Sequence, residues 1–249
     1  MMLDLKPLDK IDPGTPLAEL SKTKLAAVQR GLAICGYPIG DVDGLHGPKT
    51  RNAFAELVSD TGHGHPSIVS EDVLTYLKSR NKKLITILAS PSSTEEDVKD
   101  QIAAMFKFIG LPLTTQISYG LATTQWETAH TFKPVREAFW LSESWRKKNL
   151  RYYPYYGRGY VQLTWENNYR MYSGILGLDL LGDPDLAMRP DVALFVLAHG
   201  MKTGTFTQRT LEQYVHRTQT DFFHARRVIN GLDKAQEIAD IANQYLSDS

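Results

Sequence analysis

Apolar residues at helical spacing dominate this chain, and this pattern constrains its fold more than any other feature. Leu25, Val28 and Leu32 lie on one face of a helix that should end near Gly36. A loop with four glycines and two prolines follows, and Pro48 suits the first turn of a second helix. The second helix and a third should bury a further apolar set: Ala53, Phe54, Leu57, Val69, Val73, Leu74 and Leu77. These patterns predict a small three-helix domain.

The rest of the chain shows the same helical pattern. Ser93 and Glu96 have the spacing of a capping box, ahead of a helix that Gly110 should end. Further helices are expected over residues 114–130, over residues 191–199 after a proline, and over residues 234–246. No run of alternating strands and no repeat is present. We therefore expect a mainly α protein, divided near the charged stretch KSRNKK into residues 1–82 and 83–249.

The charge balance argues against several classes of partner. With 28 basic and 28 acidic side chains the formal net charge is zero, so nucleic acid is not expected as a partner.

Because no segment approaches the roughly 18 apolar residues of a membrane span, we expect no membrane insertion. The stretch MMLDLKPLDK lacks the apolar core of a signal peptide. The single cysteine, Cys35, excludes an intrachain disulfide and fits a reducing compartment.

Residues 151–172 hold seven of the twelve tyrosines and predict a polar, ring-lined surface. From Tyr160 the sequence alternates, so Tyr160, Gln162 and Thr164 should share one face of a short strand. Flat rings with polar tips suit a sugar chain, whose C–H faces pack on aromatic rings while its hydroxyls need directed partners. The alternative is a helical core, because Tyr169 and Tyr172 lie at helical spacing.

Two acids upstream could carry glycoside hydrolysis, which requires a pair of carboxyl groups flanking the bond. Glu127 and Glu137 would lie about 15 Å apart on one straight helix, but Pro134 should interrupt it and let Glu137 return. Four aromatic residues could form an apolar wall that keeps one carboxyl protonated: Trp126, Phe132, Phe139 and Trp140. Spacing alone leaves open that Glu127 is an ordinary surface acid.

The first loop and its flanking helices resemble the three-helix peptidoglycan-binding domain of bacterial and phage wall hydrolases. The resemblance covers about residues 20–60 and implies that residues 1–82 form such a domain, with a core of about residues 20–80. It depends on the following positions: Val28, Gln29, Leu32, Gly36, Tyr37, Gly40, Asp43, Gly44, Gly47, Pro48, Thr50, Ala53 and Phe54. It implies wall binding, with Tyr37, Asp43 and Gly44 as candidate contact residues. Most of the matching positions also suit a purely architectural role.

The motifs ETAHTFKPVREAFW and YYGRGYVQLTWENNY resemble the catalytic core of family-19 chitinases and of lysozyme-like phage endolysins. This resemblance covers about residues 115–245. It implies that Glu127 is the general acid, although Trp126 stands where a histidine is common. It implies that Glu137 is the general base, with Glu143 as the competing candidate.

The same resemblance assigns further residues of the cleft. Thr164 would help to hold the water, and Asn168 would bind substrate. Three more cleft residues are implied by the YGRG-x-x-QL motif, namely Arg158, Tyr160 and Gln162, and the motif begins at Tyr156. Ile241 stands where chitinases carry an arginine, which argues against a cleft optimised for chitin.

Together the two resemblances imply an endolysin, a phage enzyme that cuts the glycan strands of bacterial peptidoglycan by inversion and lyses the host. No metal or organic cofactor is required. We expect a monomer that accumulates in the host cytoplasm and reaches the wall with the help of a holin. The alternatives are a chitinase, a non-catalytic wall binder, and a metal enzyme using Glu127 and His130, although His130 fits a structural role better.

Overall fold

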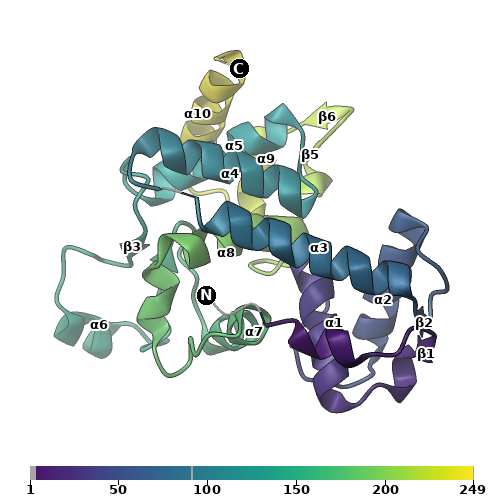
Figure 1. Cartoon of the computed structure of the whole chain (residues 1–249). Helices are drawn as coiled ribbons and strands as arrows, with labels where there is room; N and C mark the ends of the chain where they lie inside the picture. Colours follow the sequence, from purple (N-terminus) through teal and green to yellow (C-terminus); the bar gives the residue numbers. More distant parts are fainter. Residues whose placement is uncertain (1–3, 91, 249) are drawn as a thin grey trace. The chain divides into compact units, whose positions relative to one another are not determined.

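The computed structural model describes residues 4–90 and 92–248, and these are mainly helical (Figure 1). The chain divides into two compact units. Unit 1 comprises residues up to Thr86 together with Arg170–Leu178, and unit 2 comprises Ile87–Tyr169 and Asp179–Ser249. Within the described residues, no helix combines the length and the apolar character needed to cross a bilayer.

Unit 1 is built on three α-helices, α1 (Lys22–Ile34), α2 (Pro48–Thr61) and α3 (Glu71–Leu88). Short 3-10 turns η1 (Lys6–Lys10) and η2 (Leu17–Glu19) precede them, and β1 (Thr15–Pro16) pairs antiparallel with β2 (Ile68–Val69). Pro48 occupies the first turn of α2, as predicted. The core of this unit includes Leu25, Val28, Leu32, Phe54, Leu57, Val73 and Leu77, each at most 2% exposed. The expected boundary near residue 82 falls inside α3, which continues to Leu88.

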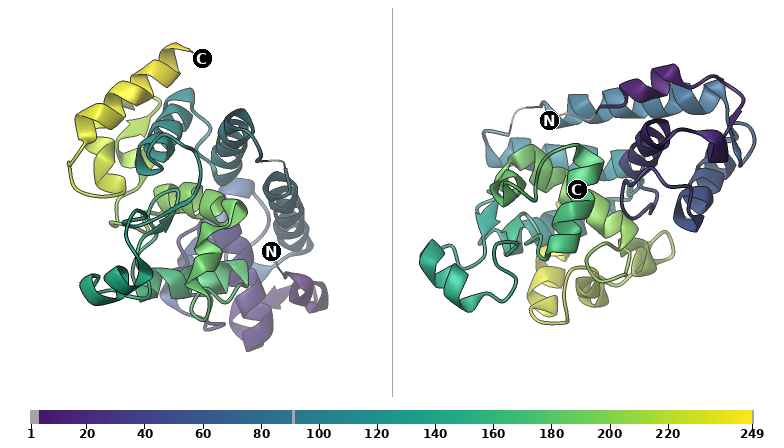
Figure 2. Two further views of the ribbon diagram at one scale, coloured as in Figure 1. Left: turned by 90° about the vertical axis from the view of Figure 1, so that its left-hand side faces the viewer. Right: turned by 90° about the horizontal axis from the view of Figure 1, so that it is seen from below.

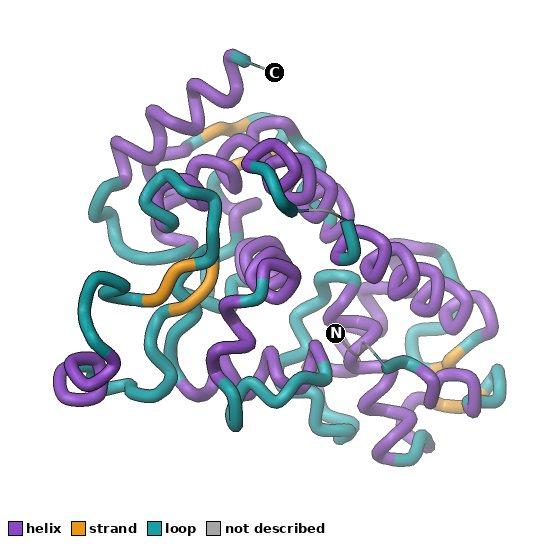
Figure 3. Tube along the Cα trace, turned by 60° about the vertical axis from the view of Figure 1, so that its left-hand side comes forward, coloured by secondary structure: helices purple, strands orange, loops and turns teal. Residues whose placement is uncertain are grey.

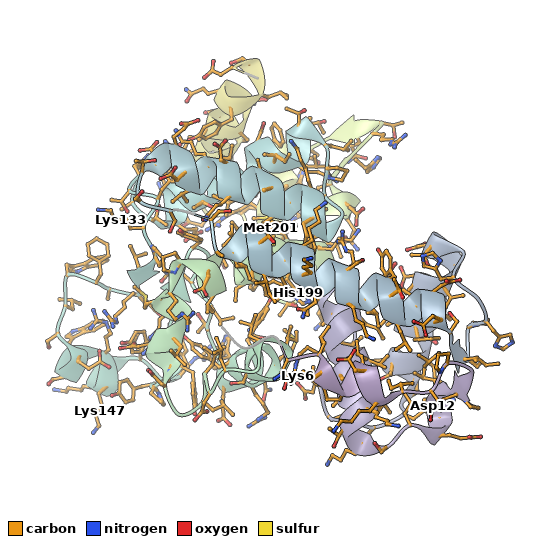
Figure 4. The ribbon with its side chains drawn as sticks, in the orientation of Figure 1. Lys6, Asp12, Lys133, Lys147, His199 and Met201 are labelled. Atoms are coloured by element: carbon orange, nitrogen blue, oxygen red, sulfur yellow. The ribbon has the colours of Figure 1, made fainter. Side chains whose placement is uncertain are left out.

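Unit 2 is built around α8 (Pro190–Thr203), in which ten consecutive residues from Val192 to Met201 are buried. Figure 4 labels two of these residues, His199 and Met201. The helices α4 (Glu95–Ile109) and α5 (Thr114–Glu127) pack against each other at Gly120, where an added Cβ would lie 2.3 Å from the ring of Phe106. The last helix, α10 (Ala235–Ser247), packs along α5 (Figure 2).

Short elements connect these helices. Unit 2 also contains α6 (Glu143–Asn149), η3 (Pro184–Met188), η4 (Leu211–Gln213), α9 (Phe222–Ala225) and η5 (Arg226–Val228). Two antiparallel pairs complete it, β3 (Val135–Arg136) with β4 (Arg158–Gly159), drawn in orange in Figure 3, and β5 (Val215–His216) with β6 (Gln219–Thr220). Helix α7 (Glu166–Leu176) begins in unit 2, and its residues from Arg170 onward belong to unit 1.

Three local expectations need correction. The capping box of α4 lies at Thr94 and Asp97, one residue later than predicted, because the Asp97 amide donates to Thr94 Oγ1 and the Thr94 amide donates to Asp97 Oδ2. Helix α5 ends at Glu127 rather than near residue 130, since the backbone of Ala129 and His130 is left-handed. The segment from Tyr160 to Trp165 does not form the predicted strand, because Gln162 has a φ of +56° and breaks the alternation.

Candidate active site

Glu127 and Glu137 line the same pocket in unit 2, although ten residues separate them in the chain. The pocket has a volume of about 380 Å³, within the range of small-molecule and cofactor sites. Its lining is Glu127, Glu137, Tyr152, Val161, Gln162, Thr164, Trp165, Asn168, Phe206, Ile229 and Asn230. The chain therefore turns back after α5, as the presence of Pro134 suggested, and brings both acids to one cavity.

The turn after Glu127 is organised by the buried hydroxyl of Thr128. This hydroxyl donates to the carbonyl of Thr124 at 2.7 Å and accepts from the Phe132 amide at 3.0 Å. Ala129 and His130 have left-handed backbone, so α5 stops and the chain leaves in a new direction. Glu127 is thereby fixed at the last position of a rigid helix, with its side chain at the pocket.

Arg226, at the start of η5, holds the Glu127 carboxylate. Its Nη1 donates to Glu127 Oε1 at 2.5 Å, and its Nε donates to the carbonyl of Asp233 at 3.1 Å. The Arg226 side chain is 5% exposed and that of Glu127 is 15% exposed, so this ion pair is largely withdrawn from water. Among the described residues Glu127 Oε2 has no hydrogen-bond partner, which leaves this oxygen for a ligand.

Glu137 follows strand β3, and two donors fix both of its carboxylate oxygens. Tyr152 donates to Oε1 at 2.6 Å, and the amide of Gly157 donates to Oε2 at 2.9 Å. A Cβ on Gly157 would lie 3.2 Å from Oε2 and 2.7 Å from Gln162 Oε1, so glycine permits this close approach. Burial, and then the hydrogen bond to Glu137, raises the pKa of Tyr152 to about 12.

Three polar residues predicted for the cleft do line the pocket, although not from a strand. The hydroxyl of Thr164 donates to the carbonyl of Gln162 at 2.7 Å, and Asn168 Nδ2 donates to the carbonyl of Thr164 at 2.8 Å. Gln162 Nε2 donates to the carbonyl of Val135, which ties the turn to β3. These bonds fix the side chains in a turn that leads into α7.

Non-glycine residues with left-handed backbone gather around this pocket. The structure has eight of them among its described residues, and six lie in the segments that carry the pocket: Ala129, His130, Phe132, Ala138, Gln162 and Trp165. Such conformations are uncommon outside glycine and occur where surrounding structure imposes them, often at functional sites. Their concentration supports the assignment of this pocket as the functional site.

Tyr156, Arg158 and Tyr160 lie in the core rather than on the pocket, which corrects the expectation that they contact substrate. Their exposed fractions are 1%, 4% and 1%. The Arg158 guanidinium stacks at 3.7 Å on the Tyr156 ring, and its Nε donates to Asp185 at 2.8 Å. It also donates to the hydroxyl of Tyr169. A buried guanidinium requires such partners, so Arg158 is a structural residue.

Glu143, the competing candidate for the base, lines a different cavity. It begins α6, where its Oε2 accepts from Arg146 Nη1 at 3.1 Å and from the Tyr156 hydroxyl at 2.9 Å. This second cavity of about 500 Å³ contains Arg136 and Glu143, whereas Glu127 and Glu137 line the first. The shared pocket therefore favours Glu137 as the partner of Glu127.

The predicted aromatic wall is not present in the pocket. Phe139 and Trp140 are 56% and 72% exposed, and Phe132 is buried in the core. Trp126 packs edge-on against His130, whose Nδ1 lies 3.0 Å from Gln125 Nε2. The aromatic side chains on the pocket are instead Tyr152, Trp165 and Phe206.

In unit 1 the candidate wall-binding residues hold the loop together. Asp43 Oδ1 accepts from Gln29 Nε2 at 2.8 Å and from the Leu45 amide at 2.9 Å. The amide of Gly44 donates to Gln29 Oε1 at 2.7 Å, and the φ of Gly44 is +68°. Tyr37 donates to Asp60 at 2.9 Å. These contacts give Asp43 and Gly44 an architectural role in the loop.

Several pocket residues were not predicted from the sequence. Tyr152 is only one of the clustered tyrosines in the sequence, and Trp165 is not among the cleft residues that the motif implies. Phe206 and Ile229 carry no motif of their own. Asn230 lies within the range of the resemblance, about residues 115–245, but outside its two quoted motifs. Arg226 lies 99 residues from Glu127 and had no local signal.

The helical fold and the match to a known family model support a glycoside hydrolase domain in this part of the chain. Residues 94–204 match the family model described as chitinase class I. This match includes Glu127, Glu137 and the turn that carries Thr164 and Asn168.

Curated relatives match over a short segment of the chain. Chitinase 8 of Oryza sativa subsp. japonica is 51% identical over 45 residues, which is 18% of this chain and 17% of the relative. An endochitinase of Arabidopsis thaliana is 55% identical over 40 residues, or 16% and 14% of the two chains. Inactive chitinase-like protein 1 of Hevea brasiliensis is 50% identical over 44 residues, or 18% and 14%. The chain thus spans less than a fifth of each of these relatives, and no solved structure matches it significantly.

Proposed function

We propose that this protein hydrolyses the β-1,4 glycosidic bonds of peptidoglycan glycan strands by general acid and base catalysis. The observation that carries the proposal is the pocket shared by Glu127 and Glu137, each fixed by its own hydrogen-bond donors. Glycosidases that invert configuration use two such carboxyl groups on opposite sides of the scissile bond.

Each acid has a different task in the proposed reaction. In the reacting complex Glu127 is the protonated acid, with its proton on Oε2 because Arg226 occupies Oε1, and it donates this proton to the departing oxygen. Glu137 accepts a proton from the attacking water, and Tyr152 and the Gly157 amide hold its carboxylate in a fixed orientation. The hydroxyl of Thr164 uses its hydrogen on Gln162, so its lone pairs can accept from that water.

The pocket suits a neutral sugar chain. Apart from the two acids, its polar side chains are uncharged, namely Tyr152, Gln162, Thr164, Asn168 and Asn230. Trp165 is 46% exposed at the pocket and offers a flat apolar face to a sugar ring. Amides and hydroxyls beside an exposed ring provide the directed hydrogen bonds and the packing surface that a saccharide needs.

Two features of the sequence favour peptidoglycan over chitin as the substrate, one in unit 1 and one in unit 2. The resemblance of the first loop of unit 1 to wall-binding domains, and Ile241 in place of an arginine, favour a bacterial wall substrate. By the same resemblance the protein acts as an endolysin that lyses a phage host. It would accumulate as a monomer in the host cytoplasm and pass a holin-permeabilised membrane.

Chitin hydrolysis is the second candidate, because the relatives that match a short part of the chain are chitinases by name. The experiment treats purified wall glycan and chitin with the protein and measures new reducing ends, identified by mass spectrometry. Reducing ends from wall glycan but not from chitin support the proposal. Release from chitin alone favours the second candidate, and binding to walls without any release identifies a non-catalytic wall binder.

A further inference from the structure

A second cavity in unit 2 differs in chemistry from the catalytic pocket. It has a volume of about 500 Å³ and lies among β3, α6 and η3. Its lining is Pro134, Val135, Arg136, Phe139, Leu141, Glu143, Arg146, Asp185 and Met188. The catalytic pocket is lined by neutral amides and hydroxyls besides its two acids. The second cavity is lined by side chains of both charges together with apolar side chains.

Arg136 and Glu143 each have side-chain atoms in this cavity that could form further hydrogen bonds. Arg136 uses only Nη2, which donates to Asp185 Oδ2 at 2.7 Å, and its other N–H groups have no partner among the described residues. Glu143 accepts at Oε2 from Arg146 and Tyr156, while its Oε1 has no partner in the described chain. The side chains of Arg136 and Glu143 are 40% and 54% exposed, so a ligand can reach them.

We propose that this cavity binds the peptide that wall glycan carries on its sugars. A peptide segment offers a carboxylate to the free N–H groups of Arg136 and an ammonium group to Glu143 Oε1. Its aliphatic portions fit against Phe139, Leu141 and Met188. Chitin carries no such peptide, so the cavity would distinguish the two glycans. This inference rests on the proposed function, because the peptide is the part of the proposed substrate that the second cavity would bind.

The two cavities are close enough for one substrate to occupy both. Arg136 lines the second cavity and Glu137, the next residue, lines the catalytic pocket. Val135 also lines the second cavity, so the change from one cavity to the other falls between Arg136 and Glu137. A peptide of four residues spans about 13 Å when extended, so it can extend past the junction between Arg136 and Glu137.

The experiment compares wall glycan before and after enzymatic removal of its peptides. The wild-type protein is expected to cut the peptide-bearing glycan about tenfold more efficiently, as measured by kcat/KM. Arg136→Gln and Phe139→Ala should lower this ratio towards one, with cleavage of the peptide-free glycan unchanged. Lys147→Gln is the matched control, because it removes one positive charge from the exposed part of α6 outside the cavity (Figure 4). Equal cleavage of the two glycans by the wild-type protein would overturn the inference.

A direct binding measurement separates this inference from the proposed function. The methyl resonance of Met188, in protein labelled at its methionine methyl groups, should shift on addition of the free wall peptide. In Arg136→Gln the shift should be lost at the same peptide concentration. If neither glycan is cut, the proposed function fails and the Met188 shift alone decides the peptide site. An unshifted Met188 resonance at saturating peptide also overturns the inference.

Discussion

Arg226 donates from Nη1 to Glu127 Oε1 at 2.5 Å, joining the end of α5 to the start of η5 across 99 residues of chain. Both side chains are largely buried, and the second contact of Arg226, to the carbonyl of Asp233, fixes the guanidinium from the other side. The position of the proposed acid is therefore set by tertiary structure as well as by its own helix.

Replacing Arg226 by glutamine should destabilise the protein and impair catalysis together. Loss of the guanidinium leaves a largely buried carboxylate without its charged partner, which costs about 3 kcal/mol. Urea unfolding should measure this loss of stability. A lower kcat at a temperature where the variant remains folded should accompany it. Unchanged stability with normal turnover would show that the ion pair does not position Glu127.

Glu127→Gln should reduce hydrolysis by about a hundredfold to ten-thousandfold, because a general acid contributes roughly that factor. The amide oxygen of glutamine can still accept from Arg226, so the fold should remain intact. Release of reducing ends from wall glycan measures the rate, and circular dichroism checks the fold. Near-normal activity in a folded variant would remove Glu127 from the mechanism.

Glu137→Gln and Glu143→Gln form a matched pair that tests the identity of the base. We expect Glu137→Gln to lose about a hundredfold or more of activity on peptide-free glycan, since a general base contributes at least that much. Glu143→Gln should stay close to wild type on the same substrate, because it lines the other cavity. The reverse order of the two rates would transfer the role of base to Glu143.

Tyr152→Phe should lower kcat about tenfold with little change in KM, because a hydrogen bond to a charged group is worth about 1.5 kcal/mol or more. The pKa of Tyr152 is raised to about 12, so its hydroxyl remains protonated and donating beyond the pH at which an ordinary tyrosine ionises. The ratio of wild-type to variant rates should therefore stay constant up to about pH 10. A ratio that falls to one below that pH would contradict the orienting role.

His199 should make the protein sensitive to acid. Burial lowers the pKa of His199 from 6.5 to about 3, so the folded state disfavours its charged form. The stabilising contribution is complete above the unfolded pKa and is lost as pH falls from 6.5 towards 3, by about 1.4 kcal/mol per pH unit. The free energy of unfolding, measured by urea titration at several pH values, should fall less steeply in His199→Phe. Equal slopes in the two proteins would contradict this account.

The helices could be predicted from the sequence because each buries a stripe of apolar residues, as Leu25, Val28 and Leu32 do in α1. The alternation after Tyr160 misled the prediction of a strand. Arg158 and Leu163 exchange both backbone hydrogen bonds, at 3.2 and 2.8 Å, and enclose a tight turn. The alternation of polar and apolar side chains does not indicate that a residue inside the turn, here Gln162, has a left-handed backbone.

The lining of the pocket was predicted in part, because the resemblance named both acids that meet there, whereas local pattern could not. Tyr156, Arg158 and Tyr160 belong to the motif, yet they are buried and do not line the pocket. The partners of the acids, Arg226 and Tyr152, depend on how distant segments pack. A motif thus indicates which residues occur near a site without separating those that face a ligand from those that hold the backbone.

The left-handed residues around the catalytic pocket have a consequence for how mutations act on this protein. The local chain around Ala129, Ala138 and Gln162 would relax to another shape if left to itself. Packing against the hydrophobic interior of unit 2 must therefore hold these residues in the left-handed conformation. Variants deep in this interior, far from any sugar, can be expected to slow turnover before they measurably lower the melting temperature.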